Sequence, residues 1–385
     1  MAAGEMAELR RAVAVTGYGV FSCFGQGPYA LRAVFAGESG FAEVTRFDTS
    51  SRRVSQAAQA PGSPVLGDVF EAVARDALTM AGHNDIPAAA GIVLGTQGAW
   101  NGLTNFWRGL GDQADPAALA GTHACALATR LGVSGGRRRV FTNACIASAS
   151  AIAHGIDLVA TGREEIALAG GGYLVDEEFF AKFDSGRALA RDGRVRPFSA
   201  DRSGLLLGDG VAMLVLEPLE VACRRGTQVR AIAAGAGFAA DSYHVCRPHP
   251  QGTGLAAAMS RALDRAGLSP GDIDYVNAHG TGTATNDPAE AAALRAAFGQ
   301  AVPPVSSTKG STGHCLEGSA ALEAVICLLA LRDGVMPPTA GFTRADPACD
   351  IDCIPRTRRR RALNAVLSAS MAFGGATAAL VFVAP

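Results

Sequence analysis

Three residues of the types that perform thiol chemistry lie far apart in the sequence: Cys145, His279 and His314. Cys145 lies in FTNACIASASAIAHG, after a short apolar segment and before a run rich in Ala and Ser. If that run is a helix, its unpaired N–H groups and its dipole favour the thiolate form of a Cys at its start. His279, in NAHGTGTATND, and His314, in STKGSTGHCLEGSA, also follow apolar segments. The set predicts acyl transfer, in which a thiolate attacks a thioester and imidazoles polarise or protonate the groups that react next.

Each of these residues also has a simpler interpretation. Most Cys are buried and inert, and a lone His is more often structural. Zinc binding would require closely paired ligands, which none of the three residues has in the sequence. Two glycine-rich segments resemble nucleotide loops, but VAVTGYGVFSCFG has Ser22 at the third Gly of G-x-G-x-x-G, and GGGYLVD lacks a P-loop Lys-Ser/Thr. We therefore expect neither a metal site nor a nucleotide site.

The composition is that of a large globular enzyme. The chain has 385 residues, of which 49% are hydrophobic and 18% charged, with a net charge of −1. These values exclude a disordered chain and give no electrostatic signature of nucleic-acid binding. The nine Cys show no disulfide-like spacing, which indicates reduced thiols and a cytoplasmic location. We expect no signal peptide, and no apolar stretch approaches the ~18 residues of a membrane span.

Short β-branched segments alternate with Ala-rich segments, and this alternation predicts an α/β fold. The expected strands are Ala12–Thr16, Gly91–Leu94, Val140–Thr142, Ile166–Ala169, Val211–Leu216, Val229–Ala234, Ile273–Asn277, Val305–Ser307, Leu363–Ser368 and Ala378–Val383. The expected helices are Val69–Gly82, Ala117–Gly132, Ala147–Thr161, Gly254–Gly267, Pro288–Phe298 and Gly318–Asp333.

The two halves of the chain resemble each other. GIVLGTQG resembles DYVNAHGTGT, and VFTNACIASASA resembles VSSTKGSTGHCLEGSAA. IALAGGG with VAMLVLEP then resembles NAVLSASMAFGG with ATAALVFVAP, in the same order along the chain. The order predicts a duplicated βα unit, with residues 1–218 carrying the nucleophile and residues 226–385 carrying both His. PLEVACRRG is interpreted as the connector.

Taken together, the motifs resemble a β-ketoacyl-acyl-carrier-protein synthase of the Cys-His-His kind, in the thiolase superfamily. Seven blocks in family order span nearly the whole chain. They are RRAVAVTGYGVFS, TNACIASASA, RVRPFSADRSGLLLGDGVAMLVLEPLEVACRRG, ADSYHVCRPHPQG, DYVNAHGTGTATNDPAE, STKGSTGHCLEGSAALEA and SMAFGG. The resemblance implies a thiolase-like fold whose duplicated βα halves form five layers, α-β-α-β-α.

The resemblance also implies a role for each matching catalytic residue. Cys145 takes the acyl chain from the phosphopantetheine of a carrier protein. His279 and His314 serve the decarboxylation of the extender unit and stabilise the enolate. Lys309 supports the His pair electrostatically, and Glu323 helps to order the site.

Further matches concern binding and support. Thr281 and Thr283 correspond to residues that hydrogen-bond the pantetheine arm, and Phe373 corresponds to a gatekeeping Phe. Met371, which stands where the family has another Phe, is also assigned to substrate binding. The backbone N–H groups of Cys145 and Phe373 would form the oxyanion hole. Two carboxylates match an acidic pair with a structural role: Asp287 and Glu290.

The implied reaction is a decarboxylative Claisen condensation of an acyl thioester, held on Cys145, with a malonyl-carrier, in type II polyketide or specialised fatty-acid biosynthesis. The protein needs no cofactor of its own, since the phosphopantetheine belongs to the acyl carrier protein. The implied assembly is a homodimer, or a heterodimer with a ketosynthase paralogue, with no nucleic acid and no membrane. The basic runs Arg137–Arg139 and Arg356–Arg361 either meet an acidic carrier or form a solvated surface.

The chain departs from the family pattern at two places. It has ASMAFGGAT at 369–377 where the family has NSFGFGGTN, and Glu317-Gly318-Ser319-Ala320 where the family has GAAG. Glu317 therefore adds a carboxylate near the site. Two alternatives stay open: an acyltransferase or cyclase without elongation, and a non-catalytic subunit like a chain-length factor. The second typically lacks the nucleophile that is present here.

Overall fold

A single large sheet lies at the centre of the computed structural model, which describes residues 11–83, 87–98, 109 and 119–385. Its strand order is β11-β10-β14-β15-β9-β1-β8-β7-β5-β6, and β2 pairs with β1. The first-half strands are β1 (Val13–Ser22), β2 (Gly25–Gln26), β5 (Gly91–Gly95), β6 (Arg138–Phe141), β7 (Ala167–Tyr173) and β8 (Gly210–Pro218). The second-half strands are β9 (Ala231–Ala240), β10 (Tyr275–Asn277), β11 (Val305–Ser306), β14 (Ala365–Met371) and β15 (Ala376–Val383). Two small sheets pair β3 (Ala42–Glu43) with β4 (Gln56–Ala57) and β12 (Val335–Met336) with β13 (Arg359–Arg360).

The large sheet consists of two copies of one five-stranded pattern. In the order β6-β5-β7-β8-β1, strand β5 is parallel to β6 and β7, and β8 is antiparallel to β7 and β1. The order β11-β10-β14-β15-β9 repeats these directions strand by strand. The copies join where β1 and β9 pair at Ala14–Ile232 and Val15–Ala231. The predicted duplication is therefore present in the topology.

The helices repeat in the same way. The first copy has α3 (Leu66–Met80) after β1, α5 (His123–Leu131) between β5 and β6, and α6 (Ala147–Ala160) after β6. The second copy has α9 (Thr253–Ala266), α10 (Asn286–Phe298) and α12 (Ser319–Asp333) at the matching places. The shorter helices are α2 (Arg32–Ala36), α7 (Glu177–Ser185), α8 (Leu219–Arg224) and α11 (Lys309–Thr312). Among the described residues, no helix has the length and apolar character of a membrane-spanning segment.

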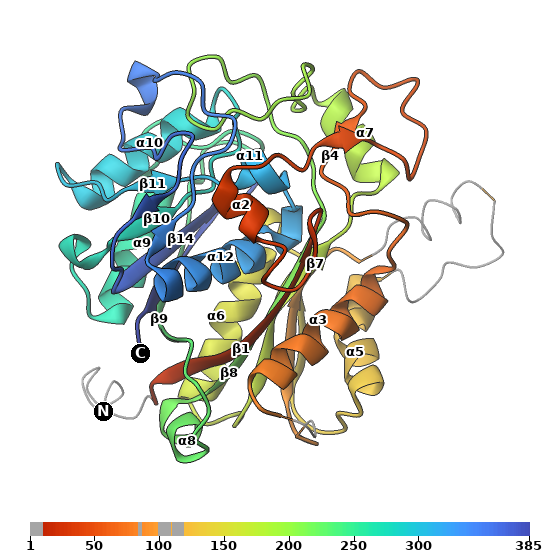
Figure 1. Ribbon diagram of the computed structural model, residues 1–385, viewed down its shortest axis with the longest axis vertical. Coiled ribbons are helices and arrows are strands. Elements are labelled where there is room, and N and C mark those ends of the chain that lie inside the picture. The colour runs from red at the N-terminus through yellow and green to blue at the C-terminus, as the bar shows by residue number, and fades with distance from the viewer. Residues whose placement is uncertain (1–10, 84–86, 99–108, 110–118) are drawn as a thin grey trace.

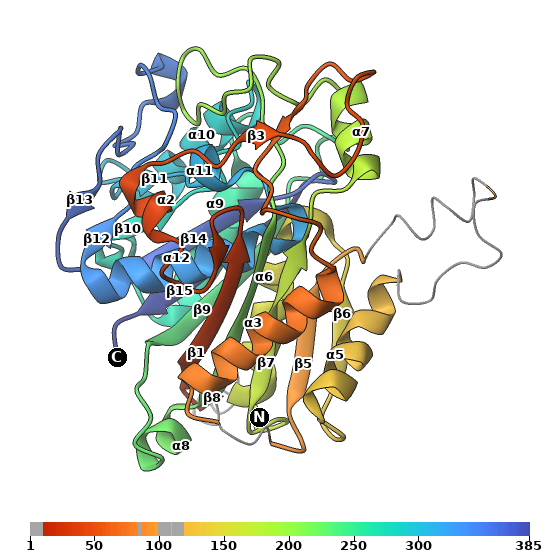
Figure 2. The same ribbon diagram turned by 45° about the vertical axis from the view of Figure 1, so that its right-hand side comes forward.

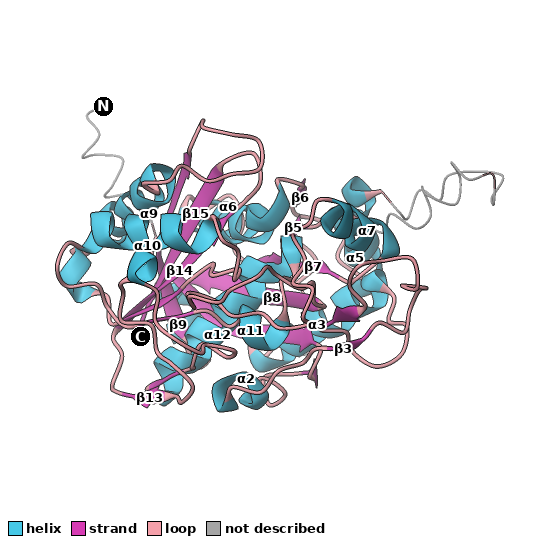
Figure 3. Ribbon diagram, turned by 90° about the horizontal axis from the view of Figure 1, so that it is seen from above, coloured by secondary structure: helices cyan, strands magenta, loops and turns pink. Residues whose placement is uncertain are grey.

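The helices and the two halves of the sheet form five layers. Helices α6 and α12 lie between the two halves, with α9 and α10 on one outer side and α3 and α5 on the other (Figure 1). Turning the molecule shows α3 and α5 over the strands of the first half (Figure 2). Seen from above, α11 and α12 lie near the middle of the molecule (Figure 3). This is the predicted α-β-α-β-α arrangement of a thiolase-like fold.

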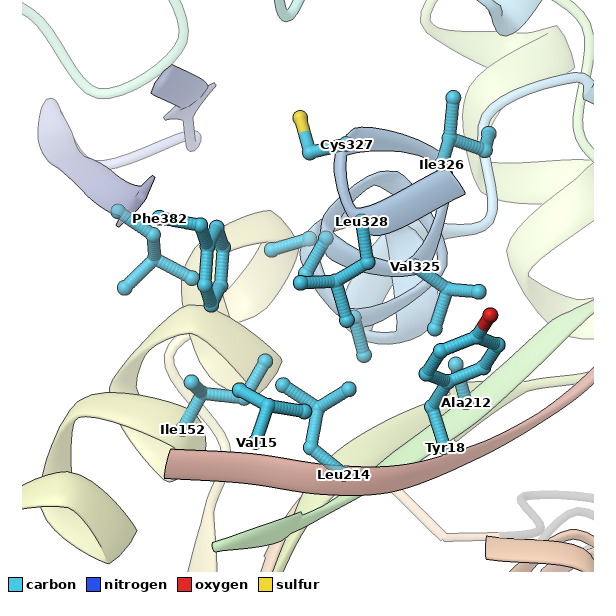
Figure 4. Packing of buried hydrophobic residues seen from close by; sticks show 14 of the residues in the cluster. Val15, Tyr18, Ile152, Ala212, Leu214, Val325, Ile326, Cys327, Leu328 and Phe382 are labelled. Atoms are coloured by element: carbon cyan, nitrogen blue, oxygen red, sulfur yellow. The ribbon is translucent and has the colours of Figure 1, made fainter. Parts of the chain in front are cut away.

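The middle layer holds the largest buried apolar cluster. Side chains of α6, α12 and the inner strand faces meet there, among them Ile152, Val325, Leu214, Tyr18 and Phe382 (Figure 4). Every residue of α12 from Ser319 to Leu331 is buried. A helix whose side chains are buried on all sides requires such a central position. The middle layer therefore holds the two copies together.

Paired glycines bring one outer helix of each copy close to its strand. A Cβ at Gly17 or Gly19 of β1 would overlap a backbone carbonyl oxygen of α3, and a Cβ at Gly235 or Gly237 of β9 would overlap one of α9. Gly17 and Gly19 of VAVTGYGVFSCFG, the segment that resembles a nucleotide loop, thus serve strand–helix packing.

The ten expected strands and six expected helices are all present, with shifted ends. Helix α5 begins at His123 and not at Ala117, because Ala120–Thr122 form a 3₁₀ turn; residues 117 and 118 lie outside the described residues. Helix α8 was missed in the segment interpreted as a connector, and α7 was missed although Asp176 caps it by accepting from the Phe179 N–H at 2.9 Å. The boundary between residues 218 and 226 stays a prediction.

We expect Gly237→Ala to destabilise the protein, because the added methyl group must push α9 away from β9. Overpacking of this kind typically costs about 1–3 kcal/mol. The measurement is the apparent midpoint of thermal unfolding. Gly271→Ala is the matched control, since only Ser269 approaches its added Cβ and the spacing is 3.9 Å. Equal midpoints for the two variants would contradict the interpretation.

Candidate active site

Cys145 lies in a sharp turn at the start of α6. The 3₁₀ turn Ala144–Ile146 links β6 to the helix, and Ala144 has a φ of +54°, which is rare for a residue with a side chain. Such strain is tolerated where the surrounding structure imposes it, as it often does at active sites. Cys145 is 6% exposed, so its thiol lies at the bottom of the site.

His314 is in direct contact with the thiol of Cys145. Its Nε2 lies 3.1 Å from the Cys145 Sγ, and its Nδ1 lies 2.9 Å from the Ser319 Oγ. The hydroxyl of Ser319 holds one ring nitrogen, which orients the other toward the sulfur. Ser319 is a functional residue that the sequence analysis did not single out, although it stands in the segment that departs from the family pattern.

His279 completes the pair of imidazoles. Its ring centroid lies 5.1 Å from that of His314, with the ring planes at 86°. The loop after β10 is held by Glu290, which accepts from the His279 and Gly280 backbone N–H groups at 2.7 Å each. Asp287 accepts from the Phe198 N–H at 2.7 Å. The two carboxylates thus have loop-holding contacts, as the resemblance implied.

Lys309 and Glu323 form a buried ion pair behind the histidines. Their side chains are 1% and 3% exposed, and the Lys309 Nζ donates to the Glu323 Oε1. Neither residue lines the cleft above Cys145. Burial lowers the pKa of His279 and of His314 well below the ordinary value, and the charge of Lys309 lowers both further. Both imidazoles are therefore neutral at pH 7.

The thiol of Cys145 is neutral as well. Burial raises its pKa to about 12, the nearby Glu317 carboxylate raises it too, and Lys309 opposes both. The expectation that the helix start keeps a thiolate was wrong, because desolvation outweighs the local dipole. Cys145 also lies in the turn, two residues before the first residue of α6. The His314 Nε2, 3.1 Å from the Sγ, is the adjacent nitrogen that could accept the thiol proton.

A cleft of about 350 Å³ opens above these groups. Its lining includes Cys145, both His, Thr281, Thr283, Met371 and Phe373. The Thr281 and Thr283 hydroxyls lie 3.0 Å apart, and Phe373, which is 50% exposed, stacks on Phe183 at 5.8 Å. The structure thus brings seven of the nine predicted site residues to one cleft and places Lys309 and Glu323 behind it. The oxyanion-hole assignment to the Cys145 and Phe373 N–H groups stays a prediction.

Two exposed arginines that the sequence analysis did not single out also line the cleft: Arg187 and Arg247. No motif indicates Arg187, while Arg247 lies inside a block quoted only for its resemblance. The two basic runs that were considered for docking contribute no residue to the cleft. Several of their members pair with local carboxylates: Arg137 with Glu164, Arg359 with Asp352 and Arg361 with Asp274.

Metal ligands do not gather at this cleft. In the described part of the chain, no three His, Cys, Asp or Glu side chains are grouped so that they could hold a metal ion. The arrangement instead combines a neutral thiol, an adjacent neutral imidazole and a second imidazole. Such a set can transfer an acyl group through a thioester.

Comparison with known proteins gives concordant matches. Residues 68–222 match the family model described as "Beta-ketoacyl synthase, N-terminal domain", and residues 230–343 match "Beta-ketoacyl synthase, C-terminal domain". The chain is 40% identical over 268 residues to Nodulation protein E of Rhizobium meliloti. This match covers 69% of this chain and 66% of that protein, so it spans just under two thirds of the relative's length. It is 32% identical to 3-oxoacyl-[acyl-carrier-protein] synthase 2 of Coxiella burnetii, over 97% of this chain and 98% of that one. Among solved structures, the ishigamide ketosynthase/chain length factor has a TM-score of 0.90 and 32% identity, covering 98% of this chain and 100% of that chain.

We expect removal of the Lys309 charge to change the pH dependence of Cys145 reactivity. The double variant Lys309→Met/Glu323→Leu avoids leaving a buried carboxylate unpaired. Burial is the larger cause of the lowered His314 pKa, and the Lys309 charge adds to it. Without that charge the pKa of His314 rises, so His314 becomes protonated at a higher pH. We therefore expect the acid limb of the alkylation profile to move to higher pH. The measurement is the rate of Cys145 alkylation against pH, by peptide mass spectrometry. Lys182→Met, at the other lysine, should leave the profile in place, and an unmoved limb in the double variant would contradict the assignment.

Proposed function

We propose, on the premise that the chain belongs to the β-ketoacyl synthase family, that it condenses an acyl thioester with malonyl-acyl carrier protein and releases CO₂. The observation that carries the proposal is the 3.1 Å contact between the Cys145 Sγ and the His314 Nε2 at the floor of a cleft that also holds His279. The similarity to a 3-oxoacyl-[acyl-carrier-protein] synthase along nearly the whole chain supports the same reaction.

In the first step the acyl chain moves to the enzyme. The Cys145 thiol gives its proton to the His314 Nε2, and the Sγ forms a bond to the thioester carbonyl carbon. The bond between that carbon and the pantetheine sulfur breaks, and the leaving thiolate takes the proton from His314. The backbone N–H groups of Cys145 and Phe373 are the proposed donors to the developing oxyanion, where such donors are most effective.

In the second step the extender unit enters the emptied cleft. The bond between the malonyl carboxylate carbon and its α-carbon breaks, CO₂ leaves, and the electron pair forms an enolate. The α-carbon then bonds to the acyl carbonyl carbon, and the bond between that carbon and the Cys145 Sγ breaks. The Cys145 thiolate takes a proton from the His314 Nε2, and solvent replaces that proton, which restores the neutral thiol. Neutral His279 can donate a hydrogen bond to the thioester oxygen as its charge grows. Neutral His314 can do the same in the tautomer that carries its proton on Nε2, with the Ser319 hydroxyl donating to Nδ1. Lys309 helps to keep both imidazoles neutral.

The proposed partner is an acyl carrier protein that presents its phosphopantetheine at the cleft. Arg187 and Arg247 are exposed there and suit the phosphate or an acidic carrier surface. A second copy or a ketosynthase paralogue is the proposed subunit partner, which is supported by the similarity to a ketosynthase/chain length factor.

We propose a cytoplasmic location, which is supported by the nine free cysteines. We also propose a role in polyketide or specialised fatty-acid synthesis.

The alternative activities can be distinguished from this proposal by two measurements, acyl loading of Cys145 and CO₂ release. An acyltransferase or cyclase loads Cys145 but releases no CO₂ from a malonyl-carrier. A non-catalytic subunit does not load at all, and the contact between Cys145 and His314 disfavours it.

We expect Cys145→Ala to abolish acyl loading, since it removes the nucleophile. The loading rate of His279→Ala should stay within about tenfold of the wild-type rate, because the imidazole that contacts the Sγ is that of His314. Its condensation rate should fall by about 10²–10⁴-fold, which is the usual effect of losing an acid–base group. Intact-mass measurement of loading and CO₂ release from malonyl-carrier separate the two steps. Loading by Cys145→Ala would overturn the proposal.

We expect Arg247→Glu to weaken carrier docking and to raise the KM for carrier-bound substrates by about tenfold. The KM for a simple pantetheine thioester should change little, because that substrate has no carrier surface. Arg224→Glu is the matched charge reversal, since Arg224 is exposed on α8 and does not line the cleft. Equal effects of the two variants would contradict a docking role for Arg247.

A further inference from the structure

The turn before α12 repeats the turn that carries the nucleophile. Each is a 3₁₀ turn of three residues, Ala144–Ile146 before α6 and Leu316–Gly318 before α12. The first residue of each turn has a positive φ, +54° at Ala144 and +40° at Leu316. The middle residue, two positions before the helix, is Cys145 in the first copy and Glu317 in the second. Glu317 is thus the internal counterpart of the nucleophile.

The counterpart of His279 is also identifiable. His279 is the second residue after β10, and Gln97 is the second residue after β5, the strand that matches β10 in the first copy. The Gln97 Nε2 donates to the Thr142 carbonyl at 2.9 Å, and the Gln97 side chain also hydrogen-bonds Glu317. The duplication therefore places a Glu–Gln pair where the other copy has a Cys–His pair.

Glu317 is buried, and no ion pair joins it to a cation among the described residues. It is 2% exposed, and its Oε2 has no hydrogen-bond partner among the described residues. Burial raises its pKa to about 7, and the nearby Asp176 raises it as well. The other titratable groups that sense its charge are Cys145 and Tyr173, neither of which is a cation. A buried polar atom with no partner is costly, so its retention points to a hydrogen-bonding group that comes from outside the chain.

Glu317 lies close to the nucleophile but outside the cleft. Its carboxylate raises the pKa of Cys145, and the two turns pack against each other. Glu317 does not line the cleft that holds the histidines. It therefore lies behind Cys145, among residues of an apolar cluster that includes Leu316, Tyr173 and Cys145 itself. A chain attached to the Sγ and directed inward would pass this position.

We propose that Glu317 and Gln97 form a polar recognition site for a hydroxyl group on the acyl chain held by Cys145. The proposal rests on the proposed function, because it requires an acyl-enzyme. A hydroxyl that donates to the Glu317 Oε2 satisfies the unpaired oxygen, whereas a saturated chain leaves that oxygen buried against methylene groups. Sites built to hydrogen-bond a substrate group reject analogues that lack the group. Glu317 and Gln97 are specificity-determining residues in this scheme.

The test compares pantetheine thioesters of octanoate and of 3-, 5- and 7-hydroxyoctanoate. The first-order rate of acyl-Cys145 formation is measured by intact mass. In the wild type we expect one hydroxy isomer to load at least about tenfold faster than octanoate. This ratio is smaller than the largest rate ratios by which such sites distinguish a substrate from an analogue that lacks the hydrogen-bonding group. Glu317→Leu should abolish this ratio, Gln97→Leu should reduce it, and Glu317→Gln should retain part of it because the carboxamide oxygen still accepts.

The control is Glu217→Gln, which neutralises a buried carboxylate that is hydrogen-bonded to Thr16 and His83, outside the cleft. It should leave the ratio at the wild-type value. A wild type that loads octanoate as fast as every hydroxy isomer would overturn the proposal, as would an unchanged ratio in Glu317→Leu. If Glu317→Leu does not fold, an unchanged ratio in Gln97→Leu overturns it instead. Failure of the proposed function is a different outcome: wild-type Cys145 then gains no mass from any thioester, or gains it without releasing CO₂ from a malonyl-carrier.

Discussion

The chemistry of this molecule depends on the packing of two central helices against each other. Helix α6 begins just after Cys145, and α12 begins just after the segment that carries His314. The direct backbone joint between the two halves of the sheet is short, with two residue pairs between β1 and β9. The apolar contacts of α6 and α12 in the middle layer must therefore hold the sulfur of one copy at the imidazole of the other. A loss of packing there separates the Cys145 Sγ from the His314 Nε2 without changing either residue.

Burial then decides the charge state of each reacting group. The thiol and both imidazoles are neutral because their charged forms are poorly solvated, and Lys309 biases the imidazoles further in the same direction. Lys309 itself is tolerated at 1% exposure because Glu323 pairs with it. The site thus keeps one compensated ion pair behind the reacting groups and leaves the groups themselves uncharged.

Much of this arrangement could be predicted from the sequence, because its elements have strong local signals. β-branched runs indicated the strands, and the similarity of the two halves indicated the repeated topology. Cys145, His279 and His314 were recognisable because each follows an apolar strand at a glycine-rich or alanine-rich turn. Other features depend on three-dimensional contacts that leave no local pattern: the raised pKa of the Cys145 thiol, the arginines of the cleft and the role of Ser319. The equivalence of Glu317 to the nucleophile became apparent only when the two turns and their backbone angles could be compared.

The distribution of lysine has a practical consequence. The chain has two lysines: Lys309 is buried in its ion pair, and Lys182 is exposed on α7. Lys182 precedes Phe183, which stacks on Phe373 at the wall of the cleft. An amine-reactive fluorophore can therefore modify one exposed lysine side chain, one residue away from the aromatic pair at the wall of the cleft. The native sequence already provides a selective labelling position for following ligand entry in real time.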